Sequence, residues 1–143
     1  ELAVDLQRRI DRLSLRDRVS LLGAQSTARI HALMSTCDVF CMASNDRAES
    51  FGVVLLEAMY FNKPILVPDT IGSGMRWLAE SYPKGHIYRV NDIDDFVRKI
   101  NQIVASGQIS DTTAEVPFKF SMTQVAETIE RHYTTIIERR KIT

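Results

Sequence analysis

The spacing of apolar residues along the chain predicts helices and strands in alternation. Apolar positions at helical spacing predict an amphipathic helix over residues 2–13, which opens without a capping residue, as expected of a segment cut from a longer chain. Short apolar runs, of the kind covered on both faces of a sheet, predict strands. These runs are 18–23, 38–42, 64–68 and 86–90. Further helices are predicted from the cap Ser26, from the loop ending at Ser50, around Trp77 and from the cap Asn91. Asn62 is expected in the left-handed position just past the helix that follows Ser50, and a capping box of Ser121 and Gln124 predicts the last helix, over 120–141.

This alternation predicts an α/β fold with a Rossmann-like parallel sheet of about four strands flanked by helices. Residues 1–143 are expected to form a single domain, with 120–141 as a closing helix. In open parallel sheets, ligands bind beyond the carboxyl ends of the strands. The predicted binding face therefore consists of the loops 23–27, 43–52, 68–75 and 90–92.

Composition narrows the possible partners. Eighteen basic and eighteen acidic residues leave no net charge, so neither nucleic acid nor a membrane surface is expected to bind through long-range attraction. No apolar run approaches the length of a membrane span. Cys37 and Cys41 are too sparse for a disulfide framework or a zinc site, and we expect free thiols in a reducing, cytoplasmic compartment.

Two glutamates eight positions apart are the main candidates for chemistry. Glu57 lies in an apolar run, so we expect it to be buried and to need a compensating partner. The first N–H groups of the helix, those of Phe51, Gly52 and Val53, form a potential anion site, about 7.5 Å from Glu57 along the helix. A ribose attached to a diphosphate would satisfy both ends. The alternative makes Glu49 an ordinary loop acid and Glu57 a core carboxylate bonded to an arginine or to the backbone.

Weaker signals have structural explanations. Asp92 and Asp94 have the spacing of a metal-binding pair, but acids at this position favour the start of a helix, and we expect no metal. The Gly72–Gly74 turn lies on the predicted binding face, with a ligand role open. Arg47 is either a solvated loop residue or a phosphate contact, and Trp77 is expected to anchor the core.

The run Arg47–Met59, followed by Lys63-Pro64-Ile65, resembles the Glu-x7-Glu motif of retaining glycosyltransferases with the GT-B fold, family four or group one. The resemblance covers essentially the whole chain. It extends to Val19–Gly23, Cys37–Phe40, Ala43-Ser44, Gly72–Gly74 and Phe120-Ser121.

The resemblance implies roles for particular residues. Glu49 would contact the donor sugar as the catalytic residue, Glu57 would bind the donor ribose, and the loop from Gly23 to Ser26 would border the nucleobase. The donor-binding residues implied are Gly23, Gln25, Arg47, Ser50, Phe51, Gly52, Val53 and Glu57. No cofactor is implied beyond the nucleotide diphosphosugar, which would donate a hexose with retention of configuration.

The match departs from the family in extent, since it corresponds only to the later part of the C-terminal half. The acceptor-binding domain and the cations that neutralise the diphosphate are expected to precede Glu1, leaving Arg47 or Arg76 for that role. We therefore expect weak donor binding and no transfer by this segment alone. An exposed sheet edge would allow a dimer, and membrane association of the longer protein stays open.

Two other classes of function are compatible with parts of the sequence. One is a non-catalytic nucleotide-sugar-binding or regulatory module that retains the pocket. The other is a response-regulator-like domain, which would need an acidic cluster at strand ends to hold Mg²⁺. Asp38 begins its strand, which disfavours this last reading.

Overall fold

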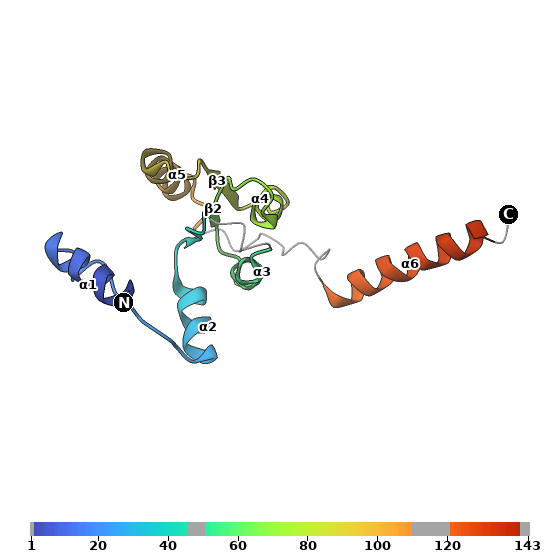
Figure 1. The fold of residues 1–143 in the computed structure, drawn as a ribbon, viewed down its shortest axis with the longest axis horizontal. Coiled ribbons are helices and arrows are strands. Elements are labelled where there is room, and N and C mark those ends of the chain that lie inside the picture. Colours follow the sequence, from blue (N-terminus) through green and yellow to red (C-terminus); the bar gives the residue numbers. More distant parts are fainter. Residues whose placement is uncertain (1, 46–50, 110–120, 141–143) are drawn as a thin grey trace. The chain divides into compact units, whose positions relative to one another are not determined.

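The chain forms helices and parallel strands in alternation. In this computed structural model, the described residues are 2–45, 51–109 and 121–140, and they divide into two compact units, residues 1–33 and residues 34–143 (Figure 1). Each unit is described by itself.

The first unit contains the predicted N-terminal helix, α1 (Leu2–Arg12), whose residue Ile10 is buried. It also contains the start of α2 (Thr27–Thr36), where Ser26 Oγ accepts a hydrogen bond from the Arg29 N–H at 3.3 Å, as predicted for a cap. The strand predicted at 18–23 is wrong, because these residues form no ladder with any part of the chain that the structure describes. A strand needs a neighbouring strand to pair its backbone N–H and C=O groups, so an apolar run alone does not form a strand.

The second unit is built on a parallel sheet of three strands in the order β1-β2-β3, one fewer than the predicted four. Phe40 pairs with Ile65, and Leu66 pairs with His86. The middle strand is buried at every position, as expected of a strand covered on both faces. The strands are β1 (Phe40–Cys41), β2 (Ile65–Pro68) and β3 (Gly85–Tyr88).

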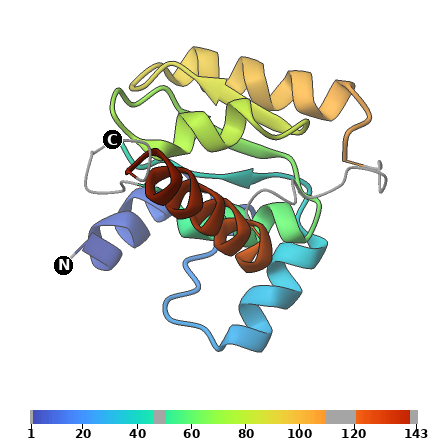
Figure 2. The same cartoon turned by 90° about the vertical axis from the view of Figure 1, so that its right-hand side faces the viewer.

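Helices cover both faces of this sheet (Figure 2). Ile65 and Val67 face α3 (Val53–Tyr60) and α4 (Gly74–Glu80), whereas Leu66 faces α5 (Ile93–Ala105). This alternation follows from the two-residue period of a strand. The core is thus divided by the sheet into two clusters, one under α3 and α4 and the other under α5.

The ends of two helices follow their local sequence. Asn62 has a φ of 56°, which confirms the left-handed conformation predicted just after α3. The cap of α5 is Asp92 instead of the predicted Asn91, because Asn91 itself adopts a left-handed φ of 61°. The Asp95 N–H donates to Asp92 Oδ1 at 2.8 Å.

Trp77 lies on the outer side of α4 and does not anchor the core as predicted, since 52% of it is exposed. The residues of α4 that are buried are Met75, Leu78 and Ala79, at positions i, i+3 and i+4. A short helix has room for only one buried face, and Trp77 falls outside it.

The last helix, α6 (Met122–Arg140), starts at the predicted cap, where the Gln124 N–H donates to Ser121 Oγ at 3.2 Å. Within the ranges described above, no helix combines the length and the apolar character needed to cross a bilayer.

Candidate functional site

The start of α3 is shaped by a glycine. Gly52 has φ 78° and ψ 54°, and the helix has no side-chain cap. A Cβ at this position would lie 2.9 Å from Leu55 Cδ1 and 3.1 Å from Met75 Cγ. Both the left-handed backbone and the close approach to α4 therefore require glycine. The sequence predicted this helix start, with its backbone N–H groups, as an anion site.

Glu57 is exposed, so the prediction of a buried carboxylate is wrong. The face of α3 that packs in the core carries Leu55, Ala58 and Met59. Glu57 lies one turn after Val53, which is 62% exposed, on the side of the helix that faces away from the core. Glu57 is therefore next to apolar residues in the sequence, but these residues do not bury its side chain. Its carboxylate is open to a ligand.

The remaining predicted site residues fall into two groups. Phe51, 37% exposed, immediately precedes the helix start and lies beside Gly52. Arg47, Glu49 and Ser50 lie outside the described residues.

The predicted nucleobase loop belongs to the first unit. Gly23 has a left-handed φ of 61°, and a Cβ there would meet nothing within 4 Å. The side-chain amide of Gln25 donates to the Leu22 carbonyl. This contact turns the loop back on itself.

Arg76, one of the two cations considered for the diphosphate, already has two carboxylate partners. Its guanidinium lies 2.6 Å from Asp69 Oδ1 and 2.8 Å from Glu80 Oε1. Hydrogen bonds to Glu80 and then to Asp69 raise the pKa of Arg76 above its ordinary value. An anion would have to compete with both carboxylates for this side chain.

A pocket of about 250 Å³ lies at the carboxyl ends of β1 and β3. It is formed by two of the four predicted binding loops and by the first turn of α5, and we call it the α5 pocket. The sequence predicted the loops but not the pocket, because its two sides are about fifty positions apart. Its lining residues are Ala43, Asn45, Tyr88, Val90, Asn91, Asp92, Ile93 and Phe96.

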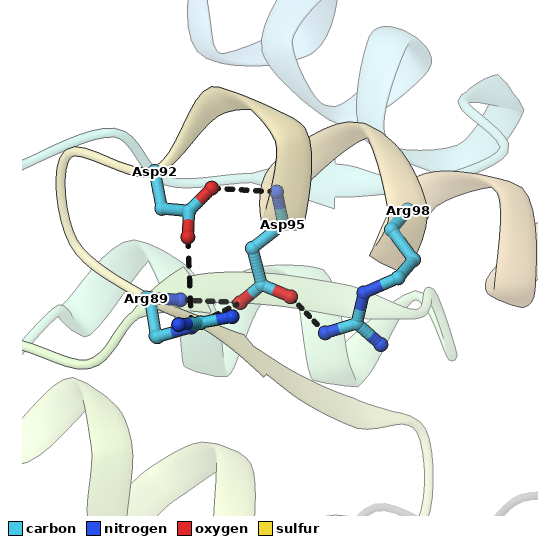
Figure 3. A network of polar contacts seen from close by, with 4 residues as sticks. All are labelled: Arg89, Asp92, Asp95 and Arg98. Atoms are coloured by element: carbon cyan, nitrogen blue, oxygen red, sulfur yellow. Dashed lines mark hydrogen bonds and ion pairs between the residues drawn. The ribbon is translucent and has the colours of Figure 1, made fainter.

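A polar network fixes the turn that borders this pocket (Figure 3). The Asp95 carboxylate, 5% exposed, accepts the Arg89 N–H at 2.7 Å and pairs with the Arg98 guanidinium. The Arg89 N–H, followed by the charge of Arg98, lowers the pKa of Asp95 despite its burial. Asp92 caps the helix, which agrees with the expectation that this acid favours the helix start. Within the described ranges, no group of three or more His, Cys, Asp or Glu side chains is placed to hold a metal ion.

Comparison with known proteins identifies similar sequences. The model of the family described as "Glycosyl transferases group 1" matches residues 2–115. The chain is 29% identical over 124 residues to a phosphatidyl-myo-inositol mannosyltransferase of Mycobacterium leprae, covering 84% of this chain and 32% of that protein. It is 28% identical over 124 residues to a lipopolysaccharide 1,6-galactosyltransferase of Salmonella typhimurium, covering 87% of this chain and 32% of that protein.

A third relative is the lipopolysaccharide core biosynthesis glycosyltransferase LpsE of Rhizobium meliloti, 30% identical over 103 residues, covering 72% of this chain and 28% of that protein. Among solved structures, sucrose-phosphate synthase from Thermosynechococcus elongatus superposes with a TM-score of 0.63 at 16% identity, covering 91% of this chain and 34% of that one. That likeness shows the GT-B fold. The chain spans about a third of the length of these proteins.

Proposed function

Because the chain belongs to the group 1 glycosyltransferases, we propose that it forms the donor-binding part of an enzyme that transfers a hexose from a nucleotide diphosphosugar with retention of configuration. The observation that carries the proposal is the geometry of α3. The helix start at Gly52, which has no side-chain cap, leads along the open side of the helix to the exposed carboxylate of Glu57. The later part of the motif that resembles the family's donor site, from Val53 to Met59, lies on this helix.

Glu57 is proposed to hold the donor ribose. A carboxylate accepts hydrogen bonds from two adjacent hydroxyls, which matches the vicinal diol of a ribose. The rise from Gly52 to Glu57 is about 7.5 Å, a distance that separates the hydroxyls from phosphates bound at the helix start. The exposure of Glu57 supports this role, because a buried side chain would be out of reach.

The start of α3 is proposed to bind the diphosphate. The positive end of the helix dipole favours an anion there. The same field would stabilise the charge that develops on the departing diphosphate. Glu49, eight positions before Glu57 in the motif, is proposed to contact the donor sugar on the strength of the resemblance alone.

The acceptor is proposed to bind to another part of a longer polypeptide. The relatives are about three times as long as the matched region, which leaves room for an acceptor-binding domain and for further cations. The two carboxylate partners of Arg76 are consistent with a diphosphate that depends on cations from elsewhere. On this proposal, the 143-residue chain binds the donor weakly and does not transfer sugar.

The proposal is tested by titrating UDP-, GDP- and ADP-hexoses into the chain and into a Glu57→Ala variant. Loss of hydrogen bonds to a charged acceptor typically costs about 1.5–3 kcal/mol, so we expect roughly 10- to 100-fold weaker binding. Glu130→Ala serves as the matched control, since Glu130 is an exposed helical glutamate on α6. Equal affinity of the Glu57→Ala variant and the parent chain would remove the ribose role.

A transfer assay separates the enzyme from a binding module. The longer protein that carries this segment should transfer hexose, and the anomeric configuration of the product reports retention. Donor binding without transfer in that protein would favour the non-catalytic alternative.

A further inference from the structure

Contacts across the α5 pocket hold its two walls together. The Tyr88 hydroxyl donates to the Met42 carbonyl at 3.2 Å, which ties β3 to the residue just after β1. Tyr88 and Phe96 pack edge to face, with ring centroids 5.1 Å apart. The turn on the third side is fixed by the network around Asp95 (Figure 3). The pocket is therefore pre-formed, which lowers the entropy cost of binding a ligand.

Among the described lining residues, the one carboxylate, that of Asp92, is already engaged. Asp92 Oδ1 accepts the Asp95 N–H at 2.8 Å, and Asp92 Oδ2 lies 3.5 Å from Arg89 Nε. The remaining walls are aromatic or aliphatic, apart from two asparagine amides. An ion would lose its hydration without gaining a partner of opposite charge, so the pocket favours an uncharged ligand.

The side-chain amides of Asn45 and Asn91 lie at the edge of the pocket and present a defined hydrogen-bonding pattern. Asn45 Nδ2 donates to Asn91 Oδ1 at 3.3 Å, which sets the orientation of both side chains. This bond leaves the carbonyl oxygen of Asn45 as an acceptor and the amino group of Asn91 as a donor. Because the amides are in contact, a ligand edge with a donor next to an acceptor would pair with both.

We propose that the α5 pocket binds a small uncharged planar ring whose edge carries a hydrogen-bond donor next to an acceptor, as in uracil, adenine or benzamide. The ring packs against Tyr88 and Phe96, and its edge pairs with Asn45 and Asn91. An apolar cavity of about 150 Å³ accommodates benzene, so 250 Å³ holds such a ring with its substituents.

This site is separate from the one proposed around Glu57. Tyr88 and Phe96 belong to the core cluster under α5, whereas α3 packs over the opposite face of the sheet. The inference therefore does not depend on nucleotide-sugar binding, and it stands or falls on its own measurement.

The experiment is an NMR titration of the 143-residue chain with uracil, adenine and benzamide, observed through backbone amide shifts. We expect saturable, millimolar binding by at least one of them, with shifts at Asn45, Tyr88 and Phe96. Toluene, which has the ring without the polar edge, should bind at least tenfold more weakly. Absence of saturable shifts with all three rings, or toluene binding as tightly as they do, would overturn the proposal.

Two variants and a control locate the site. Ala43→Phe places a ring in the pocket from an exposed wall position, and Asn91→Asp removes the donor while keeping a residue that tolerates the left-handed backbone. Each should weaken binding by at least tenfold, whereas Asn101→Asp, on the exposed side of α5, should leave it unchanged. If the NMR spectrum of Ala43→Phe shows that this variant does not fold, the affinity of Asn91→Asp alone tests the site. Parent-like affinity in a folded Ala43→Phe or in Asn91→Asp refutes the site.

Discussion

Replacing Gly85 with alanine should destabilise the second unit strongly. Gly85 is the first residue of β3, where it pairs with Ile65 and donates its N–H to the Tyr82 carbonyl at 2.8 Å. A Cβ added there would lie 1.9 Å from the carbonyl oxygen of Ala79 and 2.6 Å from its carbonyl carbon. Ala79 is buried in the cluster under α4. Neither the strand nor the helix is free to move away.

The size of the effect follows from which atoms collide. Overpacking of a core by a methyl group typically costs about 1–3 kcal/mol. Here the colliding atoms are backbone, so no rotamer change relieves them, and we expect about 3 kcal/mol, at the upper end of that range. Gly107→Ala is the matched control, because Gly107 has a left-handed φ of 75° but open space around its Cα. Its cost should be the conformational strain alone, about 1 kcal/mol.

Urea unfolding followed by circular dichroism measures both variants. With a slope of about 2 kcal/mol per molar urea, Gly85→Ala should lower the midpoint by roughly 1.5 M and Gly107→Ala by roughly 0.5 M. If the shift for Gly85→Ala is no larger than that for Gly107→Ala, then the contact between β3 and α4 is not as close as described here.

Three further predictions concern single side chains. The Thr70 hydroxyl is buried without a hydrogen-bond partner in the described part of the chain, so Thr70→Val should raise the free energy of unfolding by about 1 kcal/mol; a lower urea midpoint would contradict this. The pKa of Asp95 is lowered in the folded state, so its contribution to stability is present above the unfolded pKa of about 4 and is lost as pH falls through the folded pKa. The difference in urea midpoint between the parent chain and Asp95→Asn should therefore be constant near neutral pH and narrow in acid, and a difference independent of pH would argue against the network. Cys41 is exposed as a residue, but partial desolvation of its thiol, followed by the nearby Cys37, raises the pKa of Cys41 to about 11, so its alkylation rate should keep rising with pH up to that value instead of levelling off near the pKa of a free cysteine.

Local patterns predicted those elements whose neighbours lie close along the chain. The apolar run at 64–68 contains β2, and the caps Ser26 and Ser121 begin the helices assigned to them. The run at 18–23 has similar apolar character, yet it forms no strand among the described residues. Whether this run forms a strand depends on a second strand to pair with, and the sequence of the run does not show whether such a strand is present.

The candidate site was harder to predict for a related reason. Glu57 has apolar neighbours on both sides in the sequence, but a helix of eight residues buries only the side that meets the sheet. Which side that is depends on how α3 packs, not on its composition. The α5 pocket joins Asn45 to Asn91, and only the folded sheet brings such distant residues into contact. Asn62 and the serine caps Ser26 and Ser121 were easier to predict, because their conformational preferences are local.

The central strand has a consequence for exchange of backbone hydrogens with deuterium. Ile65, Leu66 and Val67 are fully buried, and β2 is the strand with a neighbour on each side. Their amides lose protection only when the unit unfolds as a whole, so their exchange rates report its global free energy of unfolding. The amides of 20–22, outside any ladder in the described structure, exchange without that opening. A single deuterium-labelling series would thus place these segments at opposite ends of one scale of protection.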